Sequence, residues 1–330
     1  MRYAIFSDIH GNREAWDRVL EDIREMEAEA LVCLGDIVGY GPLPQDVLAS
    51  VRRHTENIVL GNHDAAACGL LDTAFFHEKA REVLEWTKQQ LTDESLAWLR
   101  DVPYTIESEN ILFVHAEIEK PPRFGYIEEA EDAAHNFKSN EHFVTFVGHT
   151  HFPTIFELND DGQVNEHPDD DCVLSEGNRY IINVGSVGEP RHPEDIRARY
   201  VIYDSETREV LFRRVDFNPE TYRAHLAATT LDIKPYFLRV IDQQVQEMED
   251  GERYALMRDM QIPVASLDYL NAFSRAKESA EPVKPKIVVR RRRNQVSVKM
   301  VVFLILGLLA FIGGLGWFLF NAGLIGGGGQ

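Results

Sequence analysis

The sequence is poor in cysteine and lacks a secretory leader. Its 330 residues include only three cysteines, Cys33, Cys68 and Cys172, which are too few and too scattered for a disulfide framework. The first apolar run, residues 3–6, is too short for the hydrophobic core of a signal peptide. We therefore expect the amino-terminal part of the protein to be made and kept in the reducing cytosol.

Negative charge is absent from the last part of the chain and abundant before it. No Asp or Glu follows Glu281, whereas seven of the 34 Lys and Arg residues do, at positions 284, 286, 290–293 and 299. The whole chain has a formal net charge of −20, so the part up to Glu281 carries −27. A body this acidic repels a phosphate backbone, which excludes bulk nucleic-acid binding, although metal ions would still attract a single phosphorylated nucleotide.

Charged residues of either sign are missing from residues 300–320, and this segment is predicted to form a transmembrane helix. At about 1.5 Å per residue it spans about 30 Å, the thickness of a bilayer core. Basic residues precede it and the tail, residues 321–330, is uncharged, so the positive-inside rule predicts a single-pass carboxyl-terminal anchor with the large domain in the cytoplasm. The spacing of Ala310 and Gly314 would allow a homo-oligomer through this helix.

Three further segments are predicted before the membrane helix. Residues 1–217 alternate short apolar runs with amphipathic stretches, which is the pattern of an α/β domain. In this domain Asn12 is placed to cap a helix with apolar residues at helical spacing up to Met26. Residues 218–280 are predicted to be a helical extension without chemistry. Residues 281–299 form a proline-containing, basic juxtamembrane linker that would contact anionic lipid.

Five apolar, strand-like runs of the first domain each end in polar residues. The runs are residues 3–6, 30–34, 57–60, 111–114 and 143–147. A single histidine is usually an ordinary surface or core residue, but this joint order is improbable by chance, and open α/β sheets carry their sites at the carboxyl ends of strands. The side chains that follow the runs are of types that bind metal ions: Asp8, His10, Asp36, Asn62, His63, Asp64, His115, His149 and His151.

This order resembles the calcineurin-like metallophosphoesterase superfamily over residues 1–217. The resemblance is closest to the small bacterial and archaeal phosphodiesterase-type branch. It rests on three motifs besides the histidines: Ser7-Asp8-Ile9-His10-Gly11-Asn12, Gly35-Asp36-Ile37-Val38-Gly39-Tyr40-Gly41-Pro42 and Asn183-Val184-Gly185-Ser186-Val187-Gly188-Glu189-Pro190-Arg191. The resemblance implies a four-layer αββα sandwich, to which the predicted membrane helix is added.

The resemblance also implies two metal sites that share one carboxylate. Asp8, His10 and His151 would hold one ion. Asn62, His115 and His149 would hold the other, and Asp36 would bridge the two. Mixed carboxylate, amide and imidazole ligands suit two divalent ions such as Mn, Fe or Zn, but they do not decide which metal is bound.

Two such ions would generate a bridging hydroxide that attacks a phosphodiester, so no protein nucleophile is needed. His63, next to the ligand Asn62, is the candidate for protonating the leaving group. Asp64 is expected to orient His63, with turn capping as the alternative role. The expected enzyme is thus a metal-dependent phosphoric ester hydrolase that favours diesters.

Three residues are candidates for substrate contact: Arg191 as a planar phosphate donor, and Tyr40 and Arg123 at the mouth of the cleft. For Arg191 a structural ion pair remains the alternative. Phosphoprotein phosphatases carry Asp and Arg where this sequence has Gly39 and Tyr40, which disfavours that activity. Phosphomonoester or dinucleoside polyphosphate hydrolysis stays open, as does a non-catalytic membrane adaptor.

Overall fold

The computed structural model describes residues 1–192 and 195–247. The predicted linker, transmembrane helix, tail and most of the helical extension lie outside these residues, and the domain boundaries and membrane topology stay predictions. Within the described ranges, no helix is both long and apolar enough to cross a bilayer.

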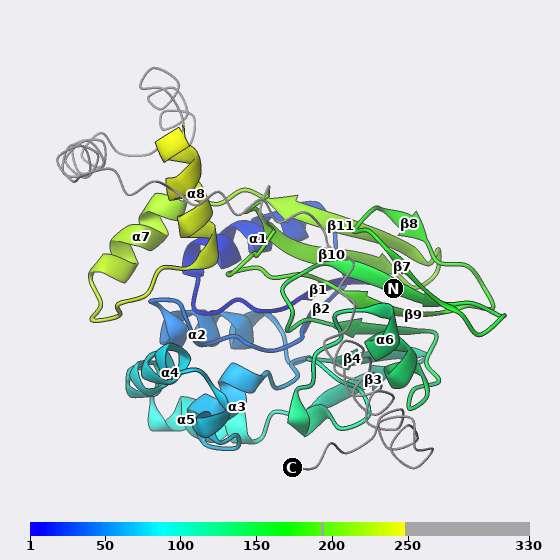
Figure 1. Cartoon of the computed structure of the whole chain (residues 1–330), viewed down its shortest axis with the longest axis horizontal. Coiled ribbons are helices and arrows are strands. Elements are labelled where there is room, and N and C mark those ends of the chain that lie inside the picture. Colours follow the sequence, from blue (N-terminus) through cyan, green and yellow to red (C-terminus); the bar gives the residue numbers. More distant parts are fainter. Residues whose placement is uncertain (193–194, 248–330) are drawn as a thin grey trace, which may run out of the picture. The chain divides into compact units, whose positions relative to one another are not determined.

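Two sheets form the centre of the described structure (Figure 1). In chain order the elements are β1 Arg2–Phe6, α1 Arg13–Glu25, β2 Ala30–Cys33, α2 Pro44–His54, α3 Asn62–Cys68, η1 Thr73–Phe75, α4 Glu78–Gln90, α5 Asp93–Arg100, β3 Thr105–Ser108, β4 Ile111–Val114, η2 Pro121–Arg123, α6 Ala130–Phe137, β5 Val144–Val147, β6 Thr154–Leu158, β7 Val164–His167, β8 Cys172–Val173, β9 Arg179–Asn183, β10 Ala198–Asp204, β11 Glu209–Val215, α7 Pro219–Ala227 and α8 Tyr236–Glu247.

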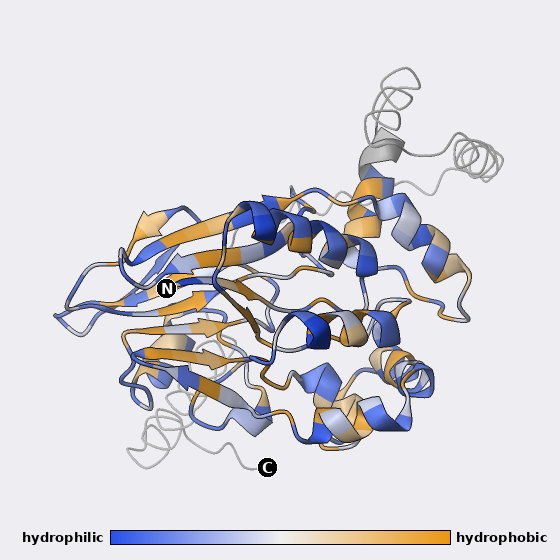
Figure 2. Cartoon of the chain, turned by 180° about the vertical axis from the view of Figure 1, so that it is seen from behind, coloured by the Kyte–Doolittle hydropathy of each residue, from blue (hydrophilic) through white to orange (hydrophobic). Residues whose placement is uncertain are grey.

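The layers follow from where apolar side chains are buried. One sheet has the strand order β2-β1-β10-β11-β8 and the other β3-β4-β5-β9-β6-β7. Residues of both sheets, such as Ile5 and Phe146, share one core between them. A second core joins the first sheet to helices that include α1 and α2, and a third joins the other sheet to α6. Figure 2 shows the hydrophobic residues gathered along the strands. The mixed α/β fold is confirmed.

Helix α1 begins and packs as its sequence predicts. The Asn12 side chain accepts a hydrogen bond from the Ala15 backbone N–H at 3.0 Å, which satisfies a donor that a helix start leaves free. Trp16 is fully buried and packs on Phe6, with ring centroids 4.6 Å apart. The Asn12 amide also donates to the Gly188 carbonyl oxygen at 2.9 Å, so the cap fixes a distant loop.

One predicted strand is wrong. Residues 57–60 were expected to form a strand like the other four runs, yet they contribute only an isolated bridge between Cys33 and Ile58. The backbone N–H of Leu60 instead donates to the Pro103 carbonyl oxygen. Residues 58–60 are buried, but the hydrogen bonds of the segment leave the sheet within three residues.

Parallel pairing brings the ends of the strands that precede the candidate ligands together. β1 pairs in parallel with β2, and β4 and β9 both pair in parallel with β5. The carboxyl ends of parallel strands meet at one edge of their sheet, so the loops after these strands are neighbours.

Candidate metal centre

Seven buried side chains from four loops and one helix start converge at these strand ends. They include the residues after β1, β2, β4 and β5 and the first residue of α3, and each is at most 7% exposed: Asp8, His10, Asp36, Asn62, His115, His149 and His151. Three groups have ligand atoms within 4.8 Å of one another and could hold a metal ion: Asp8, His10 and His151; His10, Asp36 and His63; and Asp36, His115 and His149.

The histidine tautomers leave lone pairs that face each other. The Nδ1 atoms of His10 and His151 lie 3.1 and 2.7 Å from the carbonyl oxygens of Val38 and Glu189. A carbonyl oxygen only accepts, so each Nδ1 carries the proton and each neutral ring has its lone pair on Nε2. The two Nε2 atoms lie 3.2 Å apart. This contact is repulsive unless a cation lies between the rings.

His115 is held in the same tautomer. Its Nδ1 lies 2.8 Å from the Leu34 carbonyl oxygen, and its Nε2 lies 3.1 Å from Asn62 Oδ1. A lone pair on nitrogen thus faces an amide oxygen. Both atoms are suitable ligands for one divalent ion.

Asp36 lies between the two groups of imidazoles. Its Oδ2 atom is 3.7 Å from His10 Nε2 and 3.5 Å from His115 Nε2. Burial, together with the negative charges of Asp8 and Asp64, raises the pKa of the Asp36 carboxyl well above its usual value. The anionic form that a metal needs is therefore disfavoured by the protein alone and would be stabilised by a bound cation.

Two buried polar atoms of this cluster have no hydrogen-bond partner among the described residues: Asp8 Oδ1 and His149 Nε2. Buried polar atoms are normally satisfied, so such atoms need an explanation. Burial and the neighbouring imidazoles hold the pKa of His10 and of His149 well below the usual value, so both rings are neutral, which is the form that binds metal. The donor set fits divalent metal ions.

Backbone strain is concentrated at this site. Ten described non-glycine residues have a positive φ, and five of them are candidate ligands: Asp8, His10, Asp36, His149 and His151. Each such residue costs about 1–3 kcal/mol and persists only where the surroundings enforce it. The loop hydrogen bonds do so here; the His10 N–H, for example, donates to the Asp36 carbonyl oxygen at 3.0 Å.

Gly148, the residue before His149, allows two loops of the site to lie close together. A Cβ atom on Gly148 would lie 2.1 Å from Ser7 Oγ and 2.6 Å from Asp8 Oδ2. The backbone N–H of His149 donates to Asp8 Oδ2 at 3.0 Å. Only glycine permits the β5 loop to approach the β1 loop this closely.

His63 and Asp64 are both buried beside the cluster, but they do not pair as expected. The Asp64 carboxylate accepts hydrogen bonds from the backbone N–H groups of Ile37, Val38 and Gly61 at 3.0–3.3 Å. Within the described part of the chain, His63 Nδ1 has no hydrogen-bond partner. Asp64 thus holds the β2 loop against α3, which corresponds to the turn-capping alternative.

The His63 ring is packed between aromatic rings. Its centroid is 4.6 Å from that of Tyr40 and 5.3 Å from that of Phe76. Burial and nearby imidazoles lower the pKa of His63 to about 3, so the ring is neutral. A neutral imidazole still offers one N–H donor and one acceptor.

A cleft of about 600 Å³ opens over the cluster. Its walls include Asp36, Asn62, His63, His149 and His151, as well as all three residues predicted to contact substrate: Tyr40, Arg123 and Arg191. No carboxylate of the described residues forms an ion pair with Arg191, so the structural ion pair considered for it is not found there.

The sequence did not reveal two aromatic residues of the cleft wall or one contact that supports the site. Tyr126 and Phe76 line the same cleft, but they lie in loops without a recognisable pattern. Glu189 holds His151 through its carbonyl oxygen, while its carboxylate accepts from the backbone N–H of Tyr236, the first residue of α8, at 2.8 Å. The motif that contains Glu189 was visible in the sequence, whereas its link to the helical extension was not.

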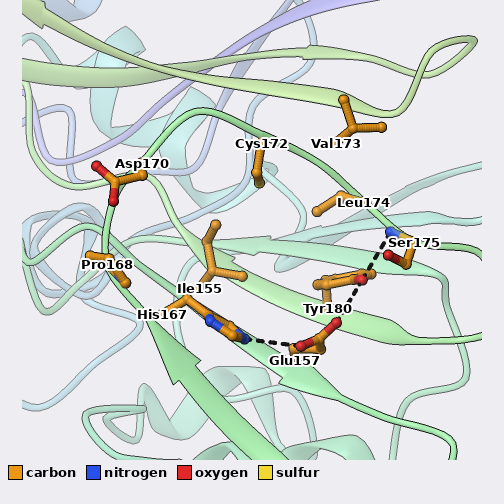
Figure 3. A pocket seen from close by; sticks show the side chains of 10 residues that line it. All are labelled: Ile155, Glu157, His167, Pro168, Asp170, Cys172, Val173, Leu174, Ser175 and Tyr180. Carbon is orange, nitrogen blue, oxygen red and sulfur yellow. Dashed lines mark hydrogen bonds and ion pairs between the residues drawn. The ribbon is translucent and has the colours of Figure 1, made fainter.

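Another cavity, of about 280 Å³, lies beside β6, β7 and β8 and is shown in Figure 3. Of the two acidic residues that line it, Glu157 and Asp170, Glu157 already interacts with Tyr180 and His167 at 2.9 Å each. Its polar groups are thus largely satisfied by one another. The unsatisfied, metal-type groups belong to the larger cleft.

Comparisons with known proteins agree with this geometry. The profile of the calcineurin-like phosphoesterase superfamily domain matches residues 1–208. An uncharacterized protein of Methanocaldococcus jannaschii is 31% identical over 260 residues, which cover 77% of this chain and 98% of that relative. A symmetrical bis(5'-nucleosyl)-tetraphosphatase of Janthinobacterium sp. is 36% identical over 123 residues, which cover 35% of this chain and 43% of that enzyme.

Solved structures show the same similarity. A metallophosphoesterase from Sphaerobacter thermophilus has 36% sequence identity and a TM-score of 0.63, covering 73% of this chain and 98% of that chain. A protein from Pyrococcus horikoshii OT3 shares the fold at 20% identity and a TM-score of 0.57, covering 72% and 96%.

Proposed function

Because the chain belongs to the calcineurin-like phosphoesterase superfamily, which implies a hydrolase, we propose that it hydrolyses phosphodiester bonds with two divalent metal ions. One observation carries the proposal: the neutral imidazoles of His10 and His151 turn their lone pairs toward each other at 3.2 Å, beside an unsatisfied oxygen of Asp8. Two opposed lone pairs repel each other, and a metal ion bound between them would remove this repulsion.

The ligands divide into two sets around Asp36. Asp8, His10 and His151 would hold one ion, and Asn62, His115 and His149 the other. Asp36 would serve both, since one oxygen lies within 3.7 Å of an imidazole of each set. Which divalent metal is bound stays open, because these ligand types suit Mn, Fe and Zn.

Two bound divalent ions supply a water of lowered pKa and positive charge for the phosphoryl oxygens. The chain itself supplies the remaining functions. Arg191, at the wall of the cleft, can bind a phosphate oxygen with a planar pair of donors. His63 presents a neutral imidazole to the same cleft, where its N–H can donate a hydrogen bond to the leaving oxygen.

Of the alternatives to phosphodiester hydrolysis, one has specific support and two are disfavoured. The similarity to a tetraphosphatase over 123 residues favours hydrolysis of a dinucleoside polyphosphate as the second candidate. Gly39 and Tyr40 occupy the positions where phosphoprotein phosphatases carry Asp and Arg, which disfavours a protein phosphatase. A non-catalytic adaptor is disfavoured because all seven predicted ligands and His63 are present in one buried cluster.

A substrate comparison with one preparation tests the proposed activity. The Mn²⁺-loaded full-length chain is expected to hydrolyse bis(4-nitrophenyl) phosphate faster than 4-nitrophenyl phosphate, because the cleft adds neutral aromatic walls to the cationic centre. Cyclic nucleotides and a dinucleoside tetraphosphate complete the series, and chelated protein serves as the control. Faster turnover of the monoester or the tetraphosphate would contradict the preference for diesters and indicate that substrate class instead. No turnover of any ester would contradict the proposal that the protein is a phosphoesterase.

A further inference from the structure

Tyr126 is an exposed aromatic residue in an otherwise buried site. It lies in the loop between η2 and α6 and is 55% exposed. Its ring stacks on the ring of His149, with centroids 4.1 Å apart and an interplanar angle of 27°. One face of the ring is therefore held by a candidate metal ligand, while much of the residue remains open to the cleft that it lines.

The rest of the cleft wall is suited to a flat, uncharged group beside a phosphate. Tyr40, Phe76 and Phe124 line it together with Tyr126, and Arg191 lies in the same wall. The volume of about 600 Å³ falls within the range of sites for small molecules.

We propose that Tyr126 is a specificity-determining residue that stacks on a planar ring of the substrate, so that the preferred substrate is a nucleotide-type phosphoester. The inference rests on the proposed function and narrows it to a substrate class. An aromatic side chain whose one face is already stacked is rigid, and it can therefore receive a base at little cost in conformational entropy. Base stacking on an aromatic residue tolerates any base, so the identity of the base is left open.

The test compares two ligands that differ only in the base. AMP and ribose 5-phosphate have the same sugar and the same phosphate, and their binding to Mn²⁺-loaded full-length protein is measured by calorimetry. We expect AMP to bind about tenfold tighter or more, within the range that stacking of one base provides. In Tyr126→Ala this ratio should fall toward one, whereas Tyr126→Phe, which keeps the ring, should retain it.

The ratio of the two affinities distinguishes stacking of Tyr126 on the base from a role in which Tyr126 only positions His149. Damage to the metal centre would weaken both ligands by the same factor, while loss of the stacking ring weakens AMP alone. Equal binding of the two ligands to the unaltered protein would overturn the inference, as would a Tyr126→Ala variant that keeps the full preference for AMP. Because binding is measured without turnover, failure of the proposed hydrolysis is read separately, from the ester series.

Discussion

Replacing Asp36 by asparagine is expected to lower kcat for bis(4-nitrophenyl) phosphate by about 10³-fold. Asp36 lies beside imidazoles of both ligand sets, with Oδ2 3.7 Å from His10 Nε2 and 3.5 Å from His115 Nε2. A neutral amide removes the anion that would join two ions, and metal ions contribute several kcal/mol to charge stabilisation in the transition state. Initial rates at saturating Mn²⁺ give the number.

The Asp36→Asn substitution keeps the size of the side chain. The Oδ1 atom of the asparagine can still accept the hydrogen bond that the backbone N–H of His63 donates at 2.8 Å. The fold should therefore survive, which circular dichroism and the melting temperature check. Asp101→Asn, which changes an exposed carboxylate at the end of α5, is the matched control and should leave kcat unchanged. Activity of Asp36→Asn within a few fold of the unaltered protein would show that Asp36 does not bridge.

Replacing His63 by alanine is expected to slow hydrolysis by about 10²- to 10⁴-fold when the leaving group is a sugar hydroxyl. A poor leaving group needs a proton or a hydrogen bond as its bond to phosphorus breaks, and His63 presents its imidazole to the cleft. With 4-nitrophenolate, which leaves unaided, the loss should be much smaller. Comparing a dinucleoside monophosphate with bis(4-nitrophenyl) phosphate measures the difference.

His135→Ala is a suitable control for the His63 variant, because His135 is exposed on α6 and pairs with Glu119 at 2.8 Å. It should alter neither rate. Metal content of the His63→Ala variant should equal that of the unaltered protein, since His63 is assigned to neither ligand set. An equal loss for both leaving groups would contradict the role of His63 at the leaving oxygen and indicate a role in metal binding or packing.

Local features of the fold were predictable because they depend on neighbours in sequence. The Asn12 cap, the buried face of α1 and four of the five strand-like runs agree with the structure. Residues 57–60 failed because a short buried apolar run has the same composition whether or not its backbone joins a sheet. The hydrogen bond from Leu60 to Pro103 depends on a contact 43 positions away.

The same distinction holds for the site: some of its residues were predictable from the sequence and others were not. The candidate ligands were recognisable because each follows an apolar, strand-like run, and parallel pairing of β1 with β2 and of β4 with β5 then brings most of them together. The partners of Asp64 were not recognisable. Its carboxylate accepts hydrogen bonds from three backbone N–H groups, and every residue except proline has such a group, so no sequence pattern identifies them. The stacking of Tyr126 on His149 and the hydrogen bond between Glu189 and the start of α8 depend on tertiary packing alone.

The number of metal ions bound per chain tests the central claim most directly. Full-length protein would be stripped with a chelator, reloaded with Mn²⁺, desalted and assayed by elemental analysis, with the protein concentration from amino-acid analysis. The opposed lone pairs of His10 and His151, the unsatisfied Asp8 and His149 atoms and the central position of Asp36 predict two ions per chain. Folded protein that binds no Mn²⁺, Fe²⁺ or Zn²⁺, or that reaches full activity with a single ion, would contradict the account.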